Sequence, residues 1–328
     1  MLRFLLRRLV IIPIALMAIN FLGYGYATLA QQVNAAANPF IARRESAPPL
    51  LSSYQAYLSG LFAPPDTQDA QAAEPVAVVP FVLAAAGNSL ILLLLSFGLG
   101  AGLGLALGLF AVRTESGGVG RWLSPVASVG MALPSFFLGA ILIAASIAVT
   151  MRAGPDAEPL LPFHGFGWDR HLVLPVLVLM VRPAVQIAKV MASLLAGESA
   201  KQYVVAAKSV GNDWRTIRRR HMLRVVIAPV VLTMAGAFRL LVAELVVVEW
   251  LFGWPGLGRL LAWTLIPPRL TNEVAAPVYL NPPMVATVFT AFAALFLVTD
   301  LVASLMVQVF DPRLRPHTEE TGGEVVRA

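Results

Sequence analysis

Five charged residues interrupt long apolar stretches of this sequence: Arg182, Arg239, Glu244, Glu249 and Asp300. A charged side chain is costly in hydrocarbon, so such residues normally pair with one another or serve a function. Arg239 and Glu244 are five positions apart and would project about 140° apart on one helix, so each needs a partner on another helix. Arg182 with Glu244 is one candidate pair. Two interpretations stay open: the charges line a path for a zwitterionic or charged solute, or they form structural ion pairs between helices or subunits.

The sequence offers little for catalysis. It has no cysteine, and its four histidines, at positions 164, 171, 221 and 317, lack the spacing of a metal site. It contains no H-E-x-x-H segment, no Ser/His or paired-carboxylate arrangement, and no G-x-x-x-x-G-K-[ST] phosphate loop. We therefore expect a non-catalytic protein with no metal ion or cofactor of its own.

Glycines at positions 98, 100, 102, 104 and 108 lie inside an apolar run that no strand precedes, which argues against a nucleotide-binding fingerprint. Gly100, Gly104 and Gly108 recur every four residues, the spacing that lets membrane helices pack closely. We expect this glycine face to pack against another helix.

The composition indicates that lipid is the solvent for much of the chain. Of its 328 residues, 58% are hydrophobic and 13% are charged, whereas a soluble domain carries about a quarter charged residues. Basic residues gathered between apolar runs account for the net charge of +6 as membrane orientation rather than nucleic-acid binding.

Six apolar stretches reach the length of about 20 residues that a helix needs to cross a bilayer. They span approximately residues 9–30, 81–112, 122–151, 172–190, 225–248 and 284–310, and predict an all-α polytopic membrane protein with six transmembrane helices. A cleaved signal peptide is the alternative for the first stretch, because Arg3, Arg7 and Arg8 precede it. Its apolar run exceeds the usual core of about 7 to 15 residues, so we expect a retained span.

Lysine and arginine counts orient the spans, because an even number places both termini on one side of the membrane. With the N-terminus in the cytoplasm, fifteen basic residues lie inside and six lie outside. We therefore expect both termini to be cytoplasmic.

Composition divides the chain into four regions. They are residues 1–30 with the first span, an extracytoplasmic segment at 31–80, the other five spans at 81–310, and a cytoplasmic tail at 311–328. Residues 52–62 predict a short amphipathic helix with Tyr54, Tyr57, Leu58 and Leu61 on one face. We expect this helix to lie at the membrane interface, with a partner contact as the alternative. Residues 249–283 form an extracytoplasmic loop before the last span.

The loop at residues 197–224, before the fifth span, carries seven basic and two acidic residues, a local net charge of +5. Residues 202–210 predict a helix that Gly211 ends through a left-handed position, and Asp213 caps a second helix that leads into the span. Ala206 and Ala207 are small enough to let a partner approach, and the arginines suit an acidic groove. Anchoring of these arginines at anionic headgroups is the alternative. The candidate contact residues are Tyr203, Ala206, Ala207, Lys208, Gly211, Asp213, Arg215, Arg218, Arg219, Arg220 and His221.

This loop resembles that of the membrane subunits of binding-protein-dependent ABC importers, specifically the dipeptide, oligopeptide and nickel class. The family's EAA motif places a glycine six residues after an acidic position, and Val205-Ala206-Ala207 followed by Gly211 has this spacing. Val205 replaces the acid, which removes one polar contact expected with the partner. Further resemblances keep family order: MLRFLLRRLVIIP at 1–13, ALPSFFLG at 132–139, VVEWLFGWPGLGRLL at 247–261, which contains Glu249, and DPRLR at 311–315.

The resemblance implies a type I ABC importer permease, the first of two homologous permease subunits, in a bacterial or archaeal plasma membrane. It implies one or two ATPase subunits that bind ATP and Mg²⁺, an extracytoplasmic solute-binding protein, and a coupling role for the loop at 197–224. The chain would then form half of a translocation path for peptides or related small solutes. A six-span secondary transporter or a membrane scaffold without ATPase partners is the alternative, although no internal repeat supports the former.

Overall fold

The computed structural model describes residues 2–37, 49–62, 74–112, 118–154, 157–267 and 278–310. These ranges contain helices and one isolated β-bridge, between Val112 and Val119, but no strand. The helices are α1 (Leu2–Ala37), α2 (Leu50–Phe62), α3 (Glu74–Phe110), α4 (Leu123–Ala132), α5 (Ser135–Ala153), α6 (Val173–Ser199), α7 (Gln202–Ser209), α8 (Trp214–Thr216), α9 (Leu223–Phe252), α10 (Leu257–Leu265) and α12 (Pro282–Phe310). The all-α prediction is confirmed for this part of the chain. The tail at 311–328, with its DPRLR segment, lies outside the described residues.

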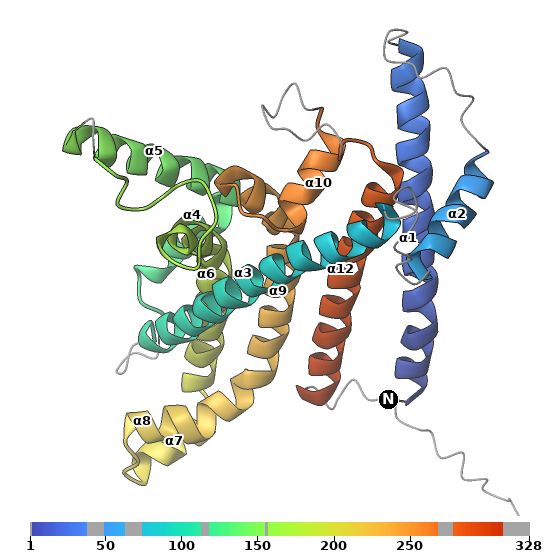
Figure 1. Ribbon diagram of the computed structural model, residues 1–328. Helices are drawn as coiled ribbons and strands as arrows, with labels where there is room; N and C mark the ends of the chain where they lie inside the picture. Colours follow the sequence, from blue (N-terminus) through green and yellow to red (C-terminus); the bar gives the residue numbers. More distant parts are fainter. Residues whose placement is uncertain are drawn as a thin grey trace, which may run out of the picture.

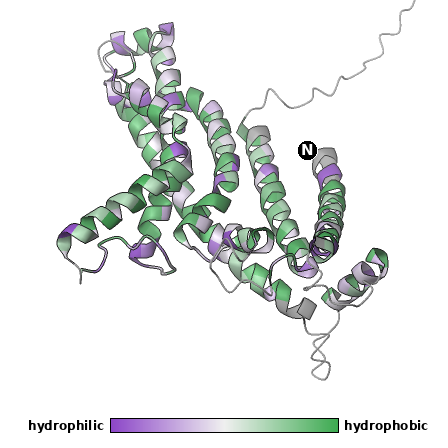
Figure 2. Ribbon diagram, turned by 90° about the horizontal axis from the view of Figure 1, so that it is seen from above, coloured by the Kyte–Doolittle hydropathy of each residue, from purple (hydrophilic) through white to green (hydrophobic). Residues whose placement is uncertain are grey.

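Among the described residues, six helices are long and apolar enough to cross a membrane, as predicted. Their spans are Arg7–Ala36, Val78–Phe110, Ser135–Ala153, Arg170–Ser199, Trp214–Phe252 and Pro282–Met306. Large apolar side chains such as Leu22, Leu94 and Phe136 are exposed on them, and Figure 2 shows hydrophobic residues along most of their length. An apolar exterior is what lipid requires, because hydrocarbon offers no partner to polar groups.

The third predicted span, at 122–151, is wrong as one continuous helix. The chain is extended at Leu133 and Pro134, with ψ angles of 118° and 144°, so the helix breaks there. Proline disfavours the helical conformation of the residue before it, which explains the break. With 10 residues, α4 is too short to cross the bilayer, and the 19 residues of α5 form the span.

The amphipathic helix predicted at 52–62 is confirmed as α2, and its expected position at the membrane interface stays a prediction. Its apolar face packs on the protein, because Tyr54 and Tyr57 are buried against Tyr24 of α1 and Ala286 of α12. The Tyr54 hydroxyl donates to the Asn20 side chain at 3.0 Å, and the Asn20 amide donates to the Tyr57 hydroxyl at 3.2 Å. These bonds satisfy polar groups that the packing removes from solvent.

The centre of the molecule is α6, in whose most apolar stretch 56% of residues are buried, against 6% in α5. Helix α3 lies along it through the predicted glycine face. A Cβ added at Gly100 would lie 2.8 Å from the Met180 carbonyl oxygen, and one added at Gly104 would lie 2.6 Å from the Ala184 carbonyl oxygen. Side chains at these positions would separate the two helices, so the prediction of close packing is confirmed.

The two ends of the bundle differ in what they carry. In Figure 1 the N-terminus and the α7–α8 region lie toward the lower end, whereas α10 lies toward the upper end. The loop at 197–224 and the start of α1 therefore share one end.

The glycine face of α3 generates a first prediction. We expect Gly104→Val to lower the thermal stability of the detergent-purified protein, because the Cβ meets backbone of α6 and the Ile187 Cβ at 2.9 Å. Overpacking of this kind costs about 1–3 kcal/mol. Gly102→Val is the matched control, since nothing lies within 4 Å of a Cβ there. Equal melting temperatures for the two variants would contradict the packing.

Candidate functional site

The loop at residues 197–224 forms a helical protrusion beyond the spans, as predicted. Gly211 has a φ of +86°, the left-handed region that a glycine adopts without strain. It ends α7, and the backbone N–H of Asn212 donates to the Ala207 carbonyl at 3.2 Å. The side chain of Asp213 then accepts a hydrogen bond from the backbone N–H of Arg215 at 3.3 Å and so caps α8.

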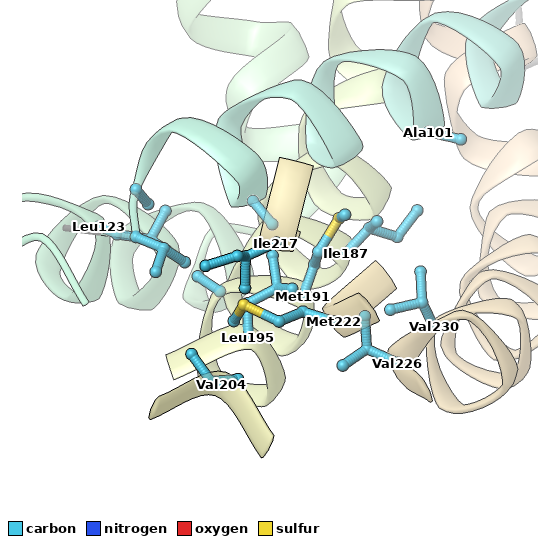
Figure 3. Close-up of a cluster of buried hydrophobic side chains, with 14 residues drawn as sticks. Ala101, Leu123, Ile187, Met191, Leu195, Val204, Ile217, Met222, Val226 and Val230 are labelled. Carbon is cyan, nitrogen blue, oxygen red and sulfur yellow. The ribbon is translucent and has the colours of Figure 1, made fainter. Parts of the chain in front are cut away.

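A buried cluster joins this loop to the spans (Figure 3). Val204, Ile217 and Met222 from the loop are fully buried against Met191 and Leu195 of α6. Ala101 of α3 and Leu123 of α4 belong to the same cluster. The loop, α6 and α3 therefore share one close-packed cluster, which resists deformation.

Three polar contacts reinforce this attachment. The Tyr203 hydroxyl donates to the carboxylate of Glu198 at 2.7 Å, and the Lys201 ammonium donates to it at 2.5 Å. Burial, followed by the adjacent Glu198 carboxylate, raises the pKa of Tyr203 to about 12, so the phenol keeps its proton at physiological pH. Arg218 donates to the carbonyl oxygen of Leu109 at 3.1 Å, which ties the loop to the end of α3.

The exposed surface of the loop consists of a few small apolar side chains next to basic residues. Val205 is 61% exposed and Val210 is 81% exposed, and Ala206 is also exposed. Lys208 lies over the Trp214 ring, 5.0 Å from its centroid. The remaining basic candidates Arg215, Arg219, Arg220 and His221 are exposed, whereas Ala207 is half-buried against the inner cluster. The predicted set therefore divides into an outer contact surface and an inner anchoring face.

The segment Ile217–Met222 is a π-helix rather than the α-helix expected to continue into α9. Ile217 and Met222 are both fully buried although they are five residues apart. In an α-helix these side chains would project about 140° apart. The π-helix bonds residue i to i+5 and so brings both to the buried face, while the intervening Arg219 and Arg220 remain outside.

The intramembrane charges form ion pairs between helices. Arg182 of α6 pairs with Glu244 of α9, which confirms the predicted pair. Arg239 of α9 finds its partner in Asp300 of α12 at 2.6 Å, and Arg8 of α1 pairs with the other carboxylate oxygen of Asp300. Structural pairing within one chain therefore accounts for four of the five charges, Glu249 being the other.

Glu249 is fully buried and caps α10 from another helix. Its carboxylate accepts from the backbone N–H of Gly258 at 2.6 Å and from the Ser89 hydroxyl at 2.6 Å, while Ser89 accepts from the N–H of Leu257 at 2.7 Å. A carboxylate suits the positive end of a helix dipole. A Cβ at Gly256 would lie 2.2 Å from the carboxylate, so only glycine fits there.

Three residues of these sites were not predicted from the sequence: Ser89, Glu198 and Arg8. Asn88 and Ser89 are adjacent polar residues within a long apolar run, a signal that marks a polar contact. In the sequence, Arg8 bears only on membrane orientation and on the signal-peptide alternative, because nothing local shows that α1 packs on α12. Within the described ranges, no group of three or more His, Cys, Asp or Glu side chains is placed to hold a metal ion.

Comparison with known proteins extends over most of the chain. The family described as binding-protein-dependent transport system inner membrane component matches residues 98–316. The peptide transport system permease protein SapB of Salmonella typhimurium is 30% identical over 176 residues, 46% of this chain and 54% of that protein. The oligopeptide transport system permease protein AppB of Bacillus subtilis is 25% identical over 236 residues, 71% of each chain. A Brucella abortus protein, provisionally named a peptide transport system permease protein, is 28% identical over 192 residues, which cover 57% of its length.

The Arg182–Glu244 pair generates a second prediction. We expect Arg182→Met and Glu244→Met each to lower the melting temperature by more than the double variant does, because each single change leaves one charge unpaired. The coupling free energy should be about 0.5–3 kcal/mol. Solute uptake by the same three variants tests whether the charges line a path, and an unchanged solute preference would contradict that role. Stability losses that simply add in the double variant would contradict the ion pair.

The capping of α10 by Glu249 generates a third prediction. Glu249→Gln keeps the size of the side chain but replaces an acceptor with a donor that faces N–H groups, so we expect a loss of about 1–3 kcal/mol in stability. Glu158→Gln, at an exposed position, is the control. Thermal unfolding checks both, and a melting temperature for Glu249→Gln equal to the control's would show that the cap contributes nothing.

Proposed function

This chain belongs to the family of binding-protein-dependent transport system inner membrane components, and we propose that it forms half of the translocation path of an ATP-driven importer for peptides or related small solutes. The resemblance found in the motifs is confirmed by the family match over residues 98–316. SapB is named a peptide and AppB an oligopeptide transport system permease protein, which supports the solute class.

The observation that carries the coupling role is the combination of an exposed α7 surface with a buried attachment. Val205 and Ala206 are exposed on one side of α7, whereas Val204 on the other side is fully buried in the cluster shared with α6 and α3. A partner bound at the exposed side moves the spans through that cluster, because packed elements shift as rigid bodies. With Val205 at the family's acidic position, the contact is apolar at its centre and basic at its rim.

The partners proposed for this chain are those that the family resemblance implies. Two ATPase subunits that bind ATP and Mg²⁺ dock on the loops at 197–224 of this chain and of a homologous second permease. An extracytoplasmic solute-binding protein delivers the solute from the opposite side. The chain itself contains no phosphate loop, which supports ATP hydrolysis by a separate subunit.

The orientation that suits this role has both termini in the cytoplasm of a cell with the importer in its plasma membrane. The excess of basic residues on that side supports it. So does the position of the N-terminus at the same end as α7 and α8 (Figure 1).

A bulky side chain on α7 tests the docking surface. We expect Ala206→Trp to abolish solute-stimulated ATP hydrolysis by the reconstituted importer. Ala206 is small and exposed on α7, so an indole in its place would clash with a subunit docked closely on that helix. The melting temperature of the chain should be unchanged, since surface substitutions usually stay within about 0.5 kcal/mol.

Ala56→Trp, at an exposed position of α2, is the matched control and should retain activity. The assay combines the chain with the second permease, the ATPases and the binding protein, and follows phosphate release with and without solute. Full stimulation by Ala206→Trp would contradict docking at α7.

A further inference from the structure

Helix α6 carries a row of polar side chains on one face, in the half that leads to the loop at 197–224. This polar stripe consists of Arg182, Gln186, Lys189 and Ser193. Spacings of four, three and four residues place the four side chains within about 60° of one another around the helix. Lys189 and Ser193 are exposed and Gln186 is half-buried. Arg182 keeps 37% of its side chain exposed although it pairs with Glu244.

The polar stripe is on the side of α6 that faces away from α3. The glycines of α3 approach Met180, Ala184 and Ile187, which project from the opposite side of α6. Elsewhere the exposed surface of the spans carries large apolar side chains, of which Leu94 is an example. The stripe is therefore a polar surface on a helix whose apolar side is already packed within the chain.

Lipid is an unsuitable neighbour for this surface. The side chain of Lys189 is long enough to extend its ammonium toward the headgroups, but those of Gln186 and Ser193 are too short to do so. Gln186 lies near the middle of the span Arg170–Ser199. Polar groups at such a depth face either the interior of a bundle or a water-filled cavity.

The stripe is exposed only in the half of α6 nearer the loop. Toward the other end, Pro175, Val178 and Leu179 continue the same face but are buried. Val178 and Leu179 belong there to the apolar cluster that includes Trp254. A polar wall that apolar packing closes beyond Arg182 has the form of a path open on one side of the membrane, as alternating access requires.

We propose that the polar stripe lines the half of the translocation path nearer the loop, where it faces water and the passing solute. All four side chains carry hydrogen-bond donors, which suit the carbonyl and carboxylate oxygens of a peptide. The second permease supplies the opposite wall. This inference rests on the importer function proposed above and names the residues of this chain that the solute passes.

The absence of cysteine from the chain makes the stripe directly testable. Gln186→Cys, Lys189→Cys and Ser193→Cys are made singly, and inverted membrane vesicles that hold the whole importer are treated with a charged methanethiosulfonate reagent. A thiol reacts as its thiolate, which apolar surroundings disfavour. We expect the mass of the chain to show modification of all three variants. Leu94→Cys, 53% exposed near the middle of α3, is the matched control and should stay unmodified.

Gln186→Cys decides between the possible neighbours of the stripe. If it stays unmodified together with the other two variants, the stripe is a dry contact with the second permease and the proposal is overturned. Modification of Lys189→Cys alone would also overturn it, because water would then reach only the level of the headgroups.

A second measurement asks whether the hydrated face belongs to the path. ATP with vanadate traps the ATPase subunits in the closed state, in which the path should close toward the cytoplasm. We expect trapping to slow the modification of Gln186→Cys while Arg121→Cys, at an exposed position before α4, reacts at an unchanged rate.

An unchanged rate for Gln186→Cys in trapped vesicles would assign the stripe to a fixed water-filled cavity and overturn its place on the path. Loss of ATP hydrolysis verifies the trapping independently. Vesicles without vanadate-sensitive hydrolysis would count against the importer function, whereas the modification pattern without ATP still decides whether the stripe faces water.

Discussion

Hydrocarbon offers no hydrogen-bond partner, so every polar group that enters the membrane must find one within the protein. This requirement makes the spans helical, and it also decides which helices contact one another. Arg182 joins α6 to α9, Asp300 joins α12 to α1 and α9, and the side chain of Asn20 holds α2 on α1. Apolar packing, by contrast, distinguishes weakly between a neighbouring helix and lipid. The few polar contacts therefore specify which helices are neighbours, and the many apolar contacts pack the space between them.

The two ends of the bundle differ in how their polar and apolar groups are arranged. At one end Glu249 caps the N-terminus of α10 and accepts hydrogen bonds from the Gly258 N–H and the Ser89 hydroxyl. At the other end the loop at 197–224 buries Val204, Ile217 and Met222 but leaves Val205 and Val210 exposed. An exposed apolar surface on a well-packed element is typical of a surface that a partner covers. The contrast distinguishes an end closed by a buried polar cap from an end with an exposed apolar surface.

Local patterns in the sequence predict local structure well here and tertiary contacts only where chemistry restricts the choice. The helix at α7, the left-handed Gly211 and the cap at Asp213 follow from residue type alone. The Arg182–Glu244 pair was predictable because opposite charges in adjacent spans have few alternatives. The contact of Arg8 with Asp300, 292 residues apart, was not, because hydrophobic periodicity does not show which spans are neighbours. The break at Pro134 was missed because the apolar run continues through it, and the π-helix because pattern analysis assumes 3.6 residues per turn.

The π-helix between α8 and α9 determines the orientation of the loop at 197–224 relative to α9. Because a π turn contains an extra residue compared with an α turn, conversion of the whole Ile217–Met222 segment to α-helix would rotate everything before it by about 100° around the helix axis. Ile217 or Met222 would then leave the buried cluster. The π-helix therefore sets the direction in which the loop leaves α9, because only this form keeps both side chains buried while α9 continues without a break.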